Sequence, residues 1–166
     1  MENFYIKILT WIRSSKQREA YFIYTCKCLP ILQAILYSFL IIHCLFMNHA
    51  QLFYVISIPV SIFTITTILR KIINRQRPYQ KYCIRPLFQN KLGQSMPSRH
   101  TASATAIALA GYIVSPIIGY VLGFIAGSIG LSRIVSGVHY ISDVLFALFL
   151  SFLIYGFILL YFPLGG

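Results

Sequence analysis

Long apolar stretches without a charged side chain dominate the pattern of this chain. Residues 28–69, 100–132 and 144–166 contain no Asp, Glu, Lys or Arg over 42, 33 and 23 positions, respectively. A membrane-spanning helix needs about 20 mostly apolar residues. The first two stretches are therefore each long enough for a helical hairpin and the third for one span. This pattern predicts an integral membrane protein.

Polar turns divide these stretches into five expected spans. Residues 47–51 interrupt the first stretch, Ser115 and Pro116 interrupt the second, and residues 70–97 form a long basic loop. We therefore expect an all-α fold, a polytopic membrane helical bundle of about five spans. The expected spans are residues 29–46, 52–69, 98–114, 116–135 and 141–162.

The first 27 residues have a different pattern, in which apolar and aromatic side chains are mixed with Lys and Arg. This pattern predicts an amphipathic helix in the membrane interface, with Trp11 at the depth of the headgroups. If this segment crossed the membrane there would be six spans, but basic side chains such as Lys7 and Arg13 make a crossing costly. We thus divide the chain into an interfacial segment, residues 1–27, and a membrane-embedded domain, residues 28–166.

Composition narrows the chemistry that this chain can perform. Of 166 residues, 14 are Lys or Arg and three are Asp or Glu, and the only carboxylate after Glu19 is Asp143. Two-metal hydrolases, magnesium sites and carboxylate-pair glycosidases need at least two converging acids, which excludes these classes. We expect no metal and no other cofactor. The net charge of +11 could indicate a nucleic-acid partner, but the long neutral stretches argue against one.

Three polar segments are expected at the same membrane face, because alternate spans end there. The first segment is RKIINRQRP, and it contains Arg70 and Arg77 seven residues apart. In a continuous helix this spacing returns both guanidinium groups to nearly the same face, where they can grip an oxyanion such as phosphate.

The second segment, PSRH (residues 97–100), supplies a helix N-terminus, and the third segment, residues 132–143, supplies a histidine. Ser98 is a natural N-cap, so the helix that Arg99 and His100 open presents free backbone N–H groups to an anion. His139 and Asp143 are four residues apart, which lets the carboxylate bind one imidazole nitrogen and leaves the other as a nucleophile.

These three segments resemble the signature of the type 2 phosphatidic acid phosphatase family, membrane lipid phosphatases that share a helical core with vanadium haloperoxidases. The family pattern is Lys, six residues and Arg-Pro; then Pro-Ser-Gly-His; then Ser-Arg, five residues, His, three residues and Asp. The third motif matches completely from Ser132 to Asp143. The second has Arg99 in place of Gly, and the first has Arg70 in place of Lys.

The resemblance covers Arg70 to Asp143 and implies a metal-independent phosphatase, which we assign to the membrane-embedded domain, residues 28–166. In this interpretation His139 attacks phosphorus and forms a phosphohistidine, Asp143 orients the imidazole, and His100 protonates the leaving oxygen and then activates water. The expected phosphate-binding residues are Arg70, Arg77, Ser98, Arg99 and Arg133.

Several alternatives stay open at this point. The substrate could be phosphatidic acid, phosphatidylglycerophosphate or a polyprenyl pyrophosphate such as undecaprenyl pyrophosphate, and no oligomeric state follows from the sequence. A non-catalytic carrier of anionic lipids could use the same basic cluster, and a structural membrane protein could bind headgroups with the basic loop. We expect a multi-pass protein of the cell membrane. The positive-inside rule predicts a cytoplasmic site, whereas the family resemblance favours the outer or lumenal face.

Overall fold

The computed structural model of the protein describes residues 1–47, 49–88 and 92–163. Residues 89–91 of the predicted basic loop, including Lys91, and the last three residues lie outside this part. Within the described residues the secondary structure is helical. The elements are α1 (Glu2–Arg13), α2 (Lys16–Met47), α3 (His49–Ile73), α4 (Pro78–Lys81), α5 (Arg99–Val114), α6 (Pro116–Val135) and α7 (Ile141–Tyr161).

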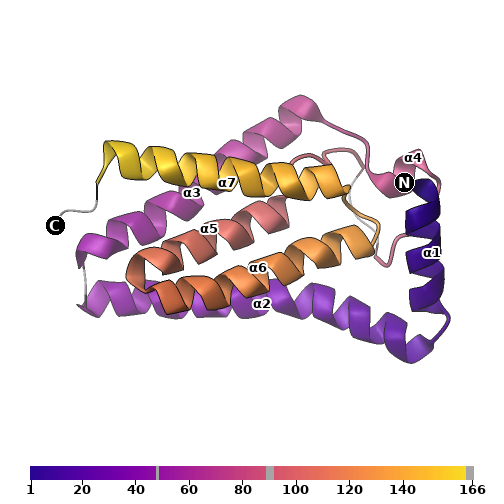
Figure 1. Cartoon of the computed structure of the whole chain (residues 1–166), viewed down its shortest axis with the longest axis horizontal. Helices are drawn as coiled ribbons and strands as arrows, with labels where there is room; N and C mark the ends of the chain where they lie inside the picture. Colours follow the sequence, from indigo (N-terminus) through magenta and orange to yellow (C-terminus); the bar gives the residue numbers. More distant parts are fainter. Residues whose placement is uncertain (48, 89–91, 164–166) are drawn as a thin grey trace.

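Five long helices form a bundle with α5 at its centre (Figure 1). Helix α5 packs against α2, α3, α6 and α7. Its alanines explain this position, because small side chains let neighbouring helices approach closely. Ala102 and Ala106 pack against Ile58 and Ile62 of α3, and other α5 alanines pack against α6.

The structure confirms the all-α membrane bundle. Among the described residues, four segments are long and apolar enough to cross a membrane: α2, the segment from the start of α3 to the end of α4 (His49–Lys81), α6 and α7. The remaining expected span is α5, which has 16 residues and is shorter than the about 20 residues that a span needs. Because the other helices surround it, α5 need not present a long lipid-facing surface of its own.

The N-terminal segment differs from its predicted boundaries. Helix α1 ends at Arg13, and residues 16–27, which we expected in the interface, form the beginning of α2. The turn between them is held by the guanidinium of Arg13, which donates to the Pro86 carbonyl (2.8 Å) and pairs with Glu19. Helix α1 lies across the end of the bundle (Figure 1), with Trp11 exposed.

Two prolines inside the long helices create hydrogen-bonding sites for neighbouring helices. Proline has no N–H, so Pro30 and Pro59 leave the carbonyls four residues earlier without their helical donors. The carbonyl of Cys26 instead accepts a hydrogen bond from the guanidinium of Arg133. The carbonyl of Val55 accepts one from the hydroxyl of a tyrosine of α2, at 2.9 Å. The side chains of other helices thus satisfy both freed carbonyls, as apolar surroundings require.

Candidate active site

The structure places the predicted site residues at one end of the bundle. They come from the end of α3, the loop after it, the start of α5, the end of α6, and the turn before α7 with the first turn of α7. In Figure 1 this is the end that α1 covers, opposite the C-terminus. The eight residues are Arg70, Arg77, Ser98, Arg99, His100, Arg133, His139 and Asp143.

His139 and Asp143 face each other, with His139 Nδ1 3.6 Å from Asp143 Oδ2. Both side chains are buried, and His139 is 2% exposed. Only Asp143 lies in a helix, because α7 begins at Ile141 after an N-cap at Tyr140. Oδ2 of Asp143 accepts a hydrogen bond from the Tyr140 N–H at 2.9 Å, so the N-terminus of α7 fixes the carboxylate beside the imidazole.

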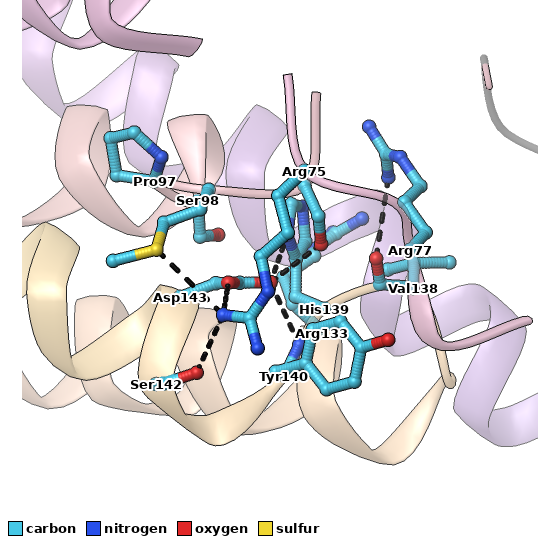
Figure 2. A network of polar contacts seen from close by, with 12 residues as sticks. Arg75, Arg77, Pro97, Ser98, Arg133, Val138, His139, Tyr140, Ser142 and Asp143 are labelled. Carbon is cyan, nitrogen blue, oxygen red and sulfur yellow. Dashed lines mark hydrogen bonds and ion pairs between the residues drawn. The ribbon is translucent and has the colours of Figure 1, made fainter. Parts of the chain in front are cut away.

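Two residues that the sequence analysis missed also hold Asp143. The Ser95 hydroxyl donates to Oδ2 at 2.5 Å, and Arg75 Nη1 donates to Oδ1 at 2.8 Å. Figure 2 shows the guanidinium of Arg75 between Asp143 and Ser142, against the ring of Tyr140. Arg75 lies in the first polar segment, but no spacing rule singled it out among the basic residues there.

The surroundings of His139 keep its imidazole neutral. Burial lowers the pKa of His139, and the positive charges of Arg77 and Arg70 lower it further, while Asp143 acts in the opposite direction. The main chain of His139 is fixed on both sides. Its N–H donates to the Arg133 carbonyl at 3.3 Å, and its carbonyl accepts a hydrogen bond from the Tyr5 hydroxyl at 3.1 Å. A neutral and rigidly held imidazole is the form that can act as a nucleophile.

Arg70 and Arg77 do not share a helix face, contrary to our prediction. Helix α3 ends at Ile73, and the chain turns at Asn74, which has a φ of 40°. Arg70 donates to the Pro97 carbonyl at 2.9 Å, whereas Arg77 donates to the carbonyls of Gly93 at 3.0 Å and Val138 at 3.4 Å. The loop brings the two guanidinium groups close enough to interact electrostatically.

The other two arginines approach from different sides. The guanidinium of Arg133 donates to the Cys26 carbonyl of α2, but its buried Nε has no hydrogen-bond partner among the described residues. Arg99 is exposed, and its guanidinium carbon lies 5.9 Å from the ring centre of Phe63. Arg133 therefore retains a buried N–H without a partner among the described residues, whereas Arg99 is accessible.

Ser98 occupies the N-cap position of α5, but its hydroxyl does not cap the helix. The hydroxyl is hydrogen-bonded to that of Thr101 at 2.9 Å, and the Ser98 N–H donates to the main-chain carbonyl of Asp143 at 3.1 Å. The first turn of α5 also carries His100, and the positive charges of Arg133, Arg99 and Arg70 act on its imidazole.

Comparisons with known proteins show the family of this chain. The PAP2 superfamily model matches residues 49–164. The crystal structure of Aquifex aeolicus LpxE is 24% identical, with a TM-score of 0.67 over 89% of this chain and 87% of that chain. A transmembrane PAP2 type phosphatidylglycerolphosphate phosphatase from Bacillus subtilis is 22% identical, with a TM-score of 0.48 over 93% and 92% of the two chains. No curated protein matches in sequence.

Proposed function

The chain belongs to the PAP2 superfamily, and we propose that it is a membrane lipid phosphatase that works through a phosphohistidine intermediate without a metal ion. The observation that carries this proposal is the pair formed by His139 and Asp143. The imidazole is buried and neutral, and its Nδ1 faces Asp143, the only carboxylate in the sequence after Glu19. Its second nitrogen is then the nucleophile.

The reaction has two steps. His139 attacks phosphorus, and the bond from phosphorus to the leaving oxygen breaks. His100, whose protonated form the negative charge of the bound phosphate stabilises, gives its proton to that oxygen. Asp143 stabilises the positive charge that develops on the phosphorylated imidazole. In the second step His100 takes a proton from water, the water oxygen attacks phosphorus, and phosphate leaves His139 in its original form. The products are inorganic phosphate and the lipid alcohol, or the lipid monophosphate when the substrate is a pyrophosphate.

The arginines and the start of α5 bind the phosphate. A guanidinium has five N–H groups, and Arg70, Arg77 and Arg133 each use only some of them on main-chain carbonyls. These hydrogen bonds fix the guanidinium groups before the substrate arrives, which favours stabilisation of the transition state. Arg99 and Ser98, at the N-terminus of α5, complete the set.

We place the site at the cytoplasmic face of a cell membrane. The basic side chains lie at the same end of the bundle as the site, and the turns at the opposite end contain no Lys or Arg. Phosphatidic acid, phosphatidylglycerophosphate and polyprenyl pyrophosphates all present their phosphate groups at the membrane interface, where the site lies, and all three are candidate substrates.

Phosphate release from these three lipids tests the proposal. Purified protein in detergent is incubated with each lipid in the presence of EDTA. We expect release from at least one of them at a rate that EDTA does not change. Lipid binding without release would favour an anionic-lipid carrier, and loss of activity with EDTA would contradict the metal-independent mechanism.

A further inference from the structure

A groove on the side of the bundle leads away from the candidate active site. It has a volume of about 360 Å³ and lies between α2, α3, α5 and α6. Arg99 and His100 line its end at the active site, and the later residues of α5, such as Ile107, line its deeper part. Ala34 and Phe63 at its sides are exposed, so the groove opens toward the surrounding membrane. A lipid held at its phosphate by the active site would lie along this groove.

Gln33 of α2 is an unusual side chain to find in this groove. It is 1% exposed, and its amide nitrogen donates to the carbonyls of Ala104 at 2.7 Å and Leu122 at 3.5 Å. Because both neighbours are acceptors, the orientation of the amide is fixed. Its oxygen, Oε1, has no hydrogen-bond partner among the described residues. An unpartnered acceptor within a membrane bundle is costly, which suggests that a ligand supplies the missing donor.

The position of Gln33 indicates which part of a lipid it meets. Ala104, its partner, comes four residues after His100 in α5, which is a rise of about 6 Å along the helix. Phosphate bound near His100 therefore places the first atoms of the lipid backbone, rather than the ends of its chains, beside Gln33.

We propose that Gln33 Oε1 accepts a hydrogen bond from a hydroxyl or amide N–H that the lipid substrate carries close to its phosphate ester. The inference rests on the proposed phosphatase function and specifies its substrate class, a lipid phosphate with a hydrogen-bond donor near the phosphate ester. Phosphatidic acid and polyprenyl pyrophosphates lack such a donor on their backbones. A site that binds a donor rejects a lipid without one, since the acceptor then stays unpaired.

The test measures kcat/KM for lipids of matched chain length. Phosphatidylglycerophosphate carries a hydroxyl donor, ceramide 1-phosphate carries an amide N–H and a hydroxyl, and phosphatidic acid carries neither. Gln33→Met removes the acceptor at similar volume, whereas Gln33→Glu, protonated in these surroundings, keeps both a donor and an acceptor. Gln51→Met is the matched control, because Gln51 also donates to a carbonyl of α5, that of Ile113, at the opposite end of the helix.

We expect Gln33→Met to lower the preference for the donor-bearing lipids over phosphatidic acid by roughly five- to tenfold, and Gln33→Glu to retain it. Gln51→Met should leave the preference unchanged. A preference unaffected by Gln33→Met, or lowered as much by Gln51→Met, would overturn the inference and leave Gln33 a structural residue. A loss of the hydroxyl preference alone would identify the hydroxyl rather than the amide as the donor.

A failure of the proposed function has a different signature. No lipid would then release phosphate. Binding is then measured instead, as the rise in the melting temperature of the wild type and of Gln33→Met that each of the same three lipids causes. A larger rise with donor-bearing lipids, lost in Gln33→Met, would support the binding role of Gln33, and equal rises in both proteins would refute it.

Discussion

Asp143 receives hydrogen bonds from three groups besides its contact with His139. The Ser95 hydroxyl and the Tyr140 N–H bind Oδ2, and Arg75 binds Oδ1. These contacts hold the carboxylate in place, but the 3.6 Å separation leaves His139 Nδ1 without a hydrogen bond. Catalytic hydrogen bonds are often long before substrate binds and shorten in the reacting complex. The geometry therefore fits a carboxylate that forms its hydrogen bond to His139 only when the imidazole becomes positively charged.

Arg75 is a positioning residue in this account, because it touches Asp143 and not the phosphate ligands. Arg75→Gln should lower kcat by about tenfold or more, on the order of the cost of a charge-assisted hydrogen bond, with a smaller effect on KM. Arg75→Lys should recover part of kcat. The comparison is made by steady-state kinetics, with Lys81→Gln as a control for loss of a nearby positive charge. Equal losses in Arg75→Gln and Lys81→Gln would remove Arg75 from the catalytic arrangement.

The lowered pKa of His139 has a consequence for the pH profile. A nucleophilic imidazole must be neutral, so activity falls as the pH drops through its pKa, which lies below the usual value of about 6.5. The acid limb of kcat/KM should therefore lie below that pH. In Arg77→Gln one of the charges that lowers this pKa is absent, and the limb should move to higher pH. A limb that moves to lower pH, or stays in place, would contradict this electrostatic account.

Between helices, Arg133 of α6 and Pro30 of α2 act on the same group, the main-chain carbonyl of Cys26. Pro30 frees the Cys26 carbonyl, and Arg133 supplies its donor. Arg133→Ala should lower the stability by about 1–3 kcal/mol, since it leaves a buried carbonyl unpaired, besides reducing activity. In the double variant Pro30→Ala with Arg133→Ala, the alanine N–H can bind Cys26 again.

This double variant separates stability from catalysis. Thermal unfolding in detergent should show that Pro30→Ala restores part of the stability lost in Arg133→Ala. Activity should stay low, because the phosphate still lacks Arg133. If the stability change of the double variant equals the sum of the changes in Pro30→Ala and Arg133→Ala, the Cys26 carbonyl does not couple the two residues.

The helices were largely predictable because apolar stretches and polar turns mark them directly, whereas the contacts between distant segments were not. The spans expected at 52–69 and 116–135 correspond to α3 and α6. The same-face prediction for Arg70 and Arg77 failed because it assumed that α3 continues past Ile73. The partners of Arg133 and Asp143 depend on tertiary contacts between segments far apart in the chain, which hydropathy and spacing do not encode.

The distribution of Lys and Arg between the two ends of the bundle predicts the orientation of the whole molecule in the membrane. A cytoplasmic site places the exposed Cys83, which follows α4, inside the cell. A membrane-impermeant maleimide should leave this thiol unmodified in intact cells and modify it after permeabilisation. Cys83→Ser identifies the signal, because Cys28 is partly exposed, whereas Cys26 and Cys44 are buried. Modification of intact cells, absent in Cys83→Ser, would place the site on the outer face.

In the proposed mechanism His139 carries the phosphoryl group during turnover, and trapping of this phosphohistidine tests the mechanism. Protein mixed with a lipid that carries a radiolabelled phosphate is quenched in denaturant at alkaline pH. We predict a covalent label that survives base and is lost in acid, as a phosphohistidine is, and that is absent from folded His139→Ala. A label retained in His139→Ala, or phosphate release by that variant at the wild-type rate, would contradict the account.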